Sequence, residues 1–193
     1  MRVASLLVVA VVLASSSAQQ AKFVTKFKNL LSDYLDKNTE KACDMVVTDI
    51  MKGMTIQEIM SDIMSNVLTL VPSSKYFPAL TMLSTFDGCL KKCGSSTDKA
   101  MGNIGFAFNK HLTPVYKKCA AKVAEMKKAK KPDAAIKTQL YNLATAALTK
   151  KLVQQIILTS MSKSTEGEYN CSMGPLNTIM KTANYNMAFN KKG

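Results

Sequence analysis

Apolar residues recur at every third or fourth position along most of the chain, which is the period of an amphipathic α-helix. The stretch 56–71 is the clearest case, with apolar side chains on one broad face and polar side chains opposite. Signals for strands, such as alternating β-branched runs and Asn-Gly turns, are almost absent. The pattern predicts an all-α protein, built as a single compact domain of about seven or eight amphipathic helices.

Capping and stop residues divide this pattern into elements. Thr55 and Glu58 form a capping box that opens the helix 56–71, because the hydroxyl and the carboxylate each bond a free backbone N–H. Gly53 and Gly94 are positioned as left-handed stops. Helices are expected at 22–37, 40–52, 56–71, 78–93, 99–112, 114–131, 134–161 and 175–189.

Three details of this division depend on single residues. Thr113 and Pro114 read as a cap and first residue, so a helix is expected to end before them and a new one to begin. From Leu148 to Leu158 the chain is apolar on most sides, which predicts a central, buried helix. Residues 162–172 carry little apolar periodicity and are expected to form the main linker.

The N-terminus has the features of a secretory signal. A charged start is followed by an apolar run too short to span a bilayer, and Ser16 and Ala18 provide the small residues of a cleavage site. Residues 1–18 are therefore expected to be removed. The mature chain 19–193 would form one helical domain of a secreted, extracellular protein.

Charge is distributed unevenly over the mature chain. Residues 19–98 hold nine lysines and nine acidic residues, whereas 99–193 hold sixteen lysines against four acidic residues, a net charge of +12. Such asymmetry is typical of proteins that meet an anionic partner or surface. The one arginine, Arg2, lies in the signal. Because arginine makes the bidentate contacts that read bases and phosphates, specific nucleic-acid binding is not expected.

The stretch 117–132 concentrates seven lysines in one segment. On a helical wheel they do not gather on one face but continue round the sides of an inward apolar stripe. A solvated helix end is therefore the simpler interpretation, and diffuse attraction to an acidic polysaccharide or other anionic surface is the alternative. The residues that would make such contacts are Lys117, Lys118, Lys127, Lys128, Lys130 and Lys131.

Five cysteines enter an oxidising compartment if the chain is secreted, so disulfides are expected. Cys89 and Cys93 are four residues apart and share one helix face. We expect them to pair with Cys43 and Cys119, which makes two bridges. Cys171 is then the odd cysteine, available to link two copies of the chain.

The sequence carries no recognisable catalytic or metal-binding motif. His111 is the single histidine and reads as a surface residue at a helix end. Pro114 interrupts the helical spacing that would relate it to Cys119. One histidine and disulfide-prone cysteines give no metal-ligand set, so neither a metal nor a cofactor is expected. Asn170 begins a formal N-glycosylation sequon, in which the middle cysteine favours a disulfide over a glycan.

Methionine is frequent, at thirteen residues, and is concentrated in the second and third predicted helices. Its flexible, polarisable side chain suits a cavity that adapts to apolar guests, although ordinary core packing explains the same spacing. A ligand site would be lined by Met60, Met64, Val67, Phe86 and Phe106.

Three functions are compatible with these observations. The preferred one is a secreted, non-enzymatic carrier of an apolar small molecule or lipid. The alternative is an extracellular structural, matrix or defence protein whose basic half binds anionic polymers or membrane surfaces. A small hydrolase ranks far below both, because no set of catalytic residues supports it.

Overall fold

The structure is a computed structural model and describes residues 18–30, 39–70 and 73–179. Within these ranges the chain is all-α, with no strand, and forms one disulfide-stapled domain. Residues 18–30 are helical. The other elements are α2 (Thr39–Lys52), α3 (Ile56–Leu70), the short 3-10 helix η2 (Ser73–Lys75), α4 (Tyr76–Lys92), α5 (Thr97–Lys128), α6 (Asp133–Ala147), α7 (Lys150–Met161) and α8 (Glu166–Ile179).

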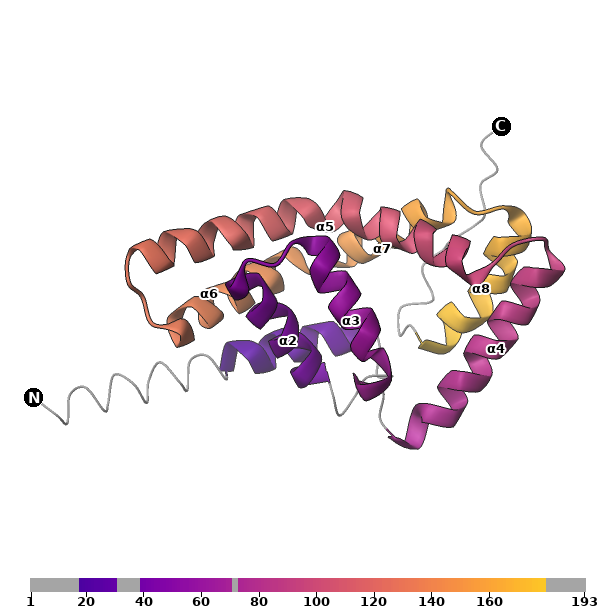
Figure 1. Cartoon of the computed structure of the whole chain (residues 1–193), viewed down its shortest axis with the longest axis horizontal. Helices are drawn as coiled ribbons and strands as arrows, with labels where there is room; N and C mark the ends of the chain where they lie inside the picture. Colours follow the sequence, from indigo (N-terminus) through magenta and orange to yellow (C-terminus); the bar gives the residue numbers. More distant parts are fainter. Residues whose placement is uncertain (1–17, 31–38, 71–72, 180–193) are drawn as a thin grey trace, which may run out of the picture.

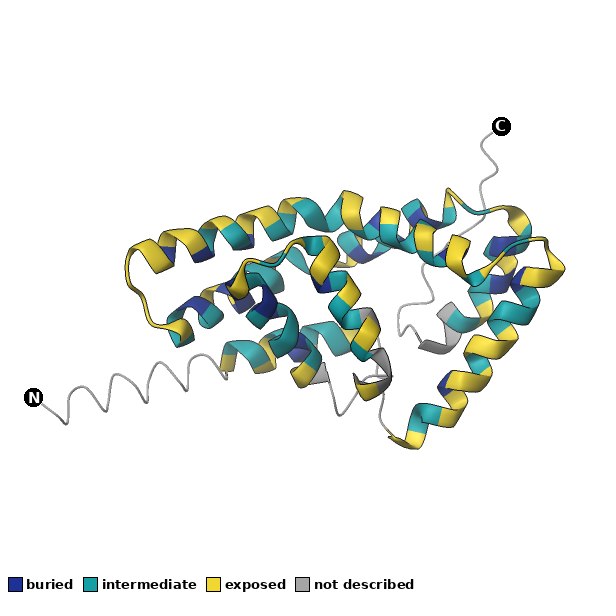
Figure 2. Cartoon of the chain, in the orientation of Figure 1, coloured by how far each residue is buried: buried dark blue, intermediate teal, exposed yellow. Residues whose placement is uncertain are grey.

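Helix α5 is the long central helix of the fold, and the other elements are arranged along it (Figure 1). Helix α6 returns beside its C-terminal half, and α7 continues along its N-terminal half. Helices α2 and α3 form a pair that packs on the middle of α5, while α4 and α8 pack together at the far end. The outer face of α5 stays exposed along most of its length (Figure 2).

The apolar core is divided among three clusters. The largest lies between α2, α5, α6 and the helical residues 18–30, and its most buried members are Ile136, Leu140 and Tyr141. A second cluster joins Val153 and Ile157 of α7 to Met173 of α8. Each cluster removes apolar side chains from water, the main source of stability for a helical domain.

The predicted break at Pro114 is wrong, because α5 runs unbroken through it for 32 residues. Pro114 has no backbone N–H, so the carbonyl of Lys110 loses its usual helical donor. The φ angle of proline is nevertheless compatible with a helix. Thr113 Oγ1 donates to the carbonyl of Asn109 at 2.5 Å. Packing of α6 and α7 along both halves of α5 outweighs the local cost.

The prediction of one long helix over 134–161 with a buried centre is also wrong. The chain leaves helical geometry at Leu148 (ψ 89°), and Thr149 caps a new helix by accepting from the Leu152 N–H at 3.1 Å. Helix α7 is amphipathic: Val153 is buried, but Leu158 is 41% exposed. Thr149 lies within an otherwise apolar run, and its hydroxyl caps the second of the two helices.

The predicted linker 162–172 contains the start of α8. Thr165 and Glu168 form a capping box, in which the Thr165 N–H donates to Glu168 Oε2 at 2.8 Å and the Glu168 N–H donates to Thr165 Oγ1 at 3.3 Å. The box predicted at Thr55 and Glu58 is confirmed, with distances of 2.6 and 3.3 Å. The predicted last helix 175–189 lies mostly outside the described residues.

The two glycine stops are confirmed. Gly53 and Gly94 have φ angles of 84° and 73°, and the residue after each donates back into the preceding helix. Helix α5 ends with the same hydrogen-bond pattern, but Lys130 occupies its left-handed position at φ 51°. A side chain is strained there where glycine is not.

The predicted disulfide pairing is wrong. Cys89 of α4 is bonded to Cys171 of α8, with their Cα atoms 5.7 Å apart. The other three cysteines are free: Cys43 and Cys119 are buried in the largest cluster, and Cys93 is exposed. The sequence spacing showed which cysteines share a face, but not which helix packs against that face.

Candidate functional site

The three predicted ligand-lining side chains that the structure describes, those of Met60, Phe86 and Phe106, do not line one common hollow. Met60 of α3 is half-buried and approaches α5, where a Cβ added to Gly105 would lie 4.0 Å from its Cε. Phe86 of α4 packs against the cluster around Leu90 at the other end of the fold. Phe106 faces outward and is 47% exposed. The side chains of Met64 and Val67 lie outside what the structure describes.

Phe106 instead lines an open hollow of about 590 Å³ on the outer face of α5. The lining residues recur at helical spacing, so they share one face of one helix. They are Phe106, Asn109, Lys110, Thr113, Pro114 and Lys117. The hollow therefore combines an aromatic ring and a proline with two lysines.

A third lysine, from a different element, contacts the aromatic ring of the hollow. The Nζ of Lys163, just beyond the end of α7, lies 4.9 Å from the centroid of the Phe106 ring. This is a cation–π contact, in which the ammonium group lies over the negative face of the ring. Lys110 and Lys117 make no hydrogen bond or ion pair with the described residues. The rim therefore carries positive charge that no carboxylate of the described residues neutralises.

The lysines of the stretch 117–132 have different roles. Lys127 Nζ donates to the carbonyl of Met51 at 2.6 Å, at the C-terminal end of α2, where a cation meets the negative end of the helix dipole. Lys122 pairs with Glu125 at 2.7 Å. Five others are exposed and have no partner among the described residues: Lys117, Lys118, Lys128, Lys130 and Lys131. Lys127 thus differs from the predicted anion-contact set, because it binds this chain's own backbone.

His111 lies within α5 and not at a helix end, which corrects the sequence interpretation. Its Nε2 is 2.7 Å from the hydroxyl of Thr159 on α7, and the imidazole is half-buried. The contact joins the two helices that pack most extensively. In the described ranges no group of three or more His, Cys, Asp or Glu side chains is arranged to hold a metal ion.

A second hollow, of about 540 Å³, lies along the helical residues 18–30. Of its two lysines, Lys22 is exposed, whereas Lys26 donates to the carbonyl of Thr145 at 2.5 Å and contributes to packing against α6. The hollow adjoins residues 31–38, of which the structure gives no description. We therefore place the candidate site on α5.

The sequence analysis missed a buried carboxylate, Glu168, which lies beside the N-terminal end of α5. Glu168 is 1% exposed, and its Oε1 accepts from Ser95 Oγ at 2.5 Å and from Lys99 Nζ at 2.7 Å. Burial alone would raise the pKa of Glu168, but the bonds from Lys99, Ser95 and the Thr165 backbone lower it overall. The T-x-x-E spacing of Thr165 and Glu168 was the available signal.

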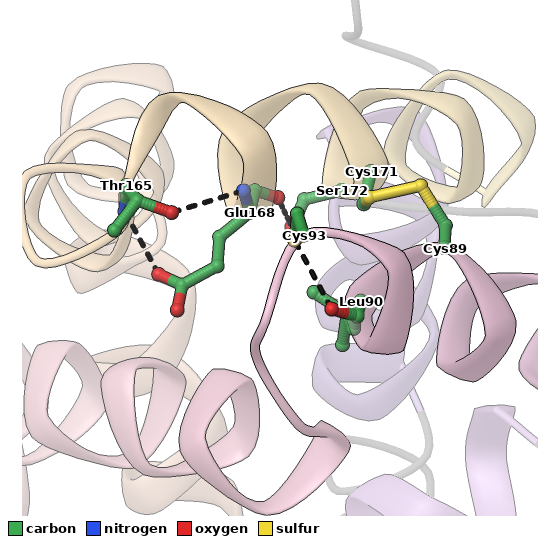
Figure 3. The surroundings of a disulfide bond; sticks show 7 residues. All are labelled: Cys89, Leu90, Cys93, Thr165, Glu168, Cys171 and Ser172. Carbon is green, nitrogen blue, oxygen red and sulfur yellow. Dashed lines mark hydrogen bonds between the residues drawn. A yellow bond between two sulfur atoms is a disulfide. The ribbon is translucent and has the colours of Figure 1, made fainter.

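The same corner contains three cysteines on two facing helices (Figure 3). Cys89 lies in the last turn of α4, Cys93 caps the C-terminal end of that helix, and Cys171 lies on α8. Gly167, one turn before Cys171, is in close contact with Cys93: a Cβ added there would lie 2.7 Å from the Cys93 Cβ. Only glycine allows the two helices to approach this closely at that level.

The chain matches no protein-family model, no curated protein and no solved structure. Among the described residues, no helix has both the length and the apolar character needed to cross a membrane.

Proposed function

We propose that the protein is a secreted, non-enzymatic carrier of amphiphiles that have an apolar chain and an anionic head group. The hollow on α5 supports this proposal through one observation: an exposed aromatic ring in contact with Lys163 shares one helix face with Lys110 and Lys117. The proposed site is thus the open face of α5, whereas the sequence predicted a methionine-lined site between helices.

The two parts of such a ligand match two kinds of surface. An apolar chain would cover Phe106 and Pro114, and its burial contributes about 25 cal/mol for each Å² removed from water. From Phe106 to Lys117 the helix rises about 16 Å, comparable to an extended chain of about a dozen carbons. A carboxylate or sulfate would gain charge-assisted bonds at the lysines. Because the hollow is open, much of the ligand stays in water and moderate affinity is expected.

The test compares two ligands with the same alkyl chain. Dodecanoate and dodecanol, below their aggregation concentrations, are titrated while the melting temperature and the displacement of a fluorescent fatty acid are measured. Dodecanoate is expected to bind and to raise the melting temperature, since a ligand at a hundred times its Kd adds about 2.7 kcal/mol of stability. Dodecanol is expected to bind at least about tenfold more weakly, because it cannot form the charge-assisted bonds.

Variants locate the binding site. The double variant Lys110→Gln, Lys117→Gln should weaken dodecanoate about tenfold and leave dodecanol unchanged. Each exposed ion pair contributes about 0.2–1 kcal/mol, and a factor of ten corresponds to about 1.4 kcal/mol. Lys118→Gln is the matched control: it is equally exposed on α5 but does not line the hollow. Equal loss in both variants, or no binding of either ligand, would reject the carrier proposal.

A second candidate function rests on the five unpartnered lysines near the C-terminal half of α5. They favour diffuse attachment to an acidic polysaccharide or anionic membrane surface, and such binding weakens steeply with salt. Retention on heparin that falls with salt, together with no response to dodecanoate, would favour this function. Secretion itself is tested by the mass of the protein recovered from the medium of expressing cells, which should begin at Gln19.

A further inference from the structure

The corner between α4 and α8 places one free thiol beside one disulfide. Helices α4 and α8 run antiparallel, since Cys89 bonds Cys171 while Cys93, one turn later, contacts Gly167, one turn earlier. Cys93 ends α4, and residue side chains four apart on a helix lie on the same face. The free Cys93 thiol is therefore next to the disulfide along that face.

The position of the Cys93 sulfur supports this arrangement. A Cβ added to Gly167 would lie 3.3 Å from the Cys93 Sγ, so the sulfur points toward α8 and not away into solvent. Its hydrogen-bond partner is the carbonyl of Leu90 at 3.1 Å. Cys93 is nevertheless an exposed residue, and Cys89 is only half-buried. Figure 3 shows the free cysteine beside the bridged pair.

The remaining cysteines do not take part. Cys43 and Cys119 are buried in the largest core cluster. Burial, together with the charges of Glu40 and Asp44, raises the pKa of Cys43 to about 12, and burial raises the pKa of Cys119. Because the thiolate is the nucleophile, both are unreactive in the folded chain.

We propose that Cys89, Cys93 and Cys171 form a thiol–disulfide exchange site. The deprotonated Cys93 sulfur attacks the Cys89 sulfur, a Cys89–Cys93 bond forms, the Cys89–Cys171 bond breaks, and Cys171 leaves as a thiolate. One disulfide and one thiol are present before and after the step, so neither an oxidant nor a reductant is consumed.

Geometry selects Cys89 as the sulfur that is attacked. Residues four apart on a helix have Cβ atoms about 5–6 Å apart, and the last turn of α4 has only to tighten to bring the two sulfurs together. A bond from Cys93 to Cys171 would instead require α8 to move by about one helical turn, since that cysteine lies level with Cys89.

The exchange would loosen one end of α8 only. It removes the covalent link between α4 and α8, while Glu168 still holds the start of α8 through Ser95 and Lys99. Cys171, buried in the linked state, becomes accessible. The site would thus convert a stapled helix pair into an open one without a change in the number of disulfides.

Differential alkylation of the folded, full-length protein tests the proposal. Iodoacetamide without reductant is added for increasing times, and peptides are mapped by mass spectrometry. Each molecule should end in one of two forms: label on Cys93 with the Cys89–Cys171 bridge intact, or label on Cys171 together with a Cys89–Cys93 bridge. Because label on Cys93 removes the attacking thiolate, iodoacetamide is kept at a low concentration, so that exchange precedes alkylation and the released Cys171 thiol is trapped.

Cys93→Ser is the matched control because it keeps the size of the side chain and removes the nucleophile. Label on Cys171 should become at least about tenfold slower, as the intramolecular attack is lost. Label on Cys43 and Cys119 should stay absent in both proteins, which shows that neither has unfolded. Label confined to Cys93 at all times, or Cys171 label at the same rate in the variant, would overturn the proposal.

Discussion

At the scale of single residues, the half-buried Tyr116 and the buried Tyr141 differ in how their hydroxyls are used. Tyr116 Oη donates to the carbonyl of Met54 at 2.8 Å and holds the α2–α3 turn on α5. Tyr141 is 1% exposed, and its hydroxyl has no partner in the described part of the chain. A buried polar group without a partner costs stability, whereas a hydrogen bond offsets that cost.

Tyr141→Phe is therefore expected to leave the free energy of unfolding unchanged or raise it by up to about 1 kcal/mol. Tyr116→Phe, the matched control, should lower it by about 1 kcal/mol, because the Met54 carbonyl loses its donor. Urea denaturation of both variants measures the difference. A larger loss for Tyr141→Phe than for Tyr116→Phe would contradict this interpretation of the two hydroxyls.

Glu168 predicts how stability depends on pH. Its folded pKa is lowered from 4.5, so its contribution is present above the unfolded value and is lost as pH falls from about 5 through the folded value. Glu168→Gln should cost about 1–3 kcal/mol at pH 7, through the loss of charge-assisted bonds, and less as the pH falls through the folded pKa.

Urea denaturation at pH 3, 5 and 7 measures this dependence. Glu166→Gln serves as the control, since Glu166 is an exposed acid in the same first turn of α8. Glu166→Gln should change the free energy of unfolding only slightly, and this change should not fall with pH as the cost of Glu168→Gln does. A Glu168→Gln cost that is equal at pH 3 and pH 7 would show that shape, not charge, matters at this position.

At the scale of elements, α5 contains a proline, Pro114, that interrupts its backbone hydrogen-bond pattern. Pro114 leaves the Lys110 carbonyl without its helical donor, and a proline in a helix interior costs about 3 kcal/mol relative to alanine. Pro114→Ala is expected to raise the free energy of unfolding by about 1–3 kcal/mol, the lower end reflecting the more flexible unfolded chain.

The reverse substitution on the same helix provides the control. Ala124 is exposed, so Ala124→Pro should lower stability by about 3 kcal/mol without affecting core contacts. Urea denaturation measures both changes. A loss of stability in Pro114→Ala would mean that the proline stabilises α5 through packing that outweighs the missing bond.

At the scale of the whole molecule, the lysines of the basic half divide into those that hold the fold and those that only add charge. Lys127→Gln is expected to lower stability by about 1 kcal/mol, since the Met51 carbonyl loses its donor. Lys128→Gln should change stability by less than about 0.5 kcal/mol. Elution from heparin should move to lower salt in Lys128→Gln and remain near wild type in Lys127→Gln. If Lys127→Gln instead shifts heparin elution and leaves stability unchanged, the contact between Lys127 and the Met51 carbonyl does not persist in solution.

The sequence alone determined the fold class, most of the helices and the places where glycine ends them. These features depend on local chemistry: the helical period of apolar residues, the capping box at Thr55 and Glu58, and the left-handed conformation at Gly53 and Gly94. The sequence also identified Phe106 and Lys117 as candidate contact residues, although it assigned them to different sites.

Only the tertiary structure decided how distant segments meet. Pro114 was read as a break because its local cost is visible in the sequence, whereas the packing that outweighs it comes from α6 and α7. Cys171 became the partner of Cys89 because α8 folds back on α4, a choice that no spacing of cysteines encodes. Lys163 reached the Phe106 ring for the same reason: a candidate site is set by which helix faces pack together, and many weak contacts across the whole chain determine that packing.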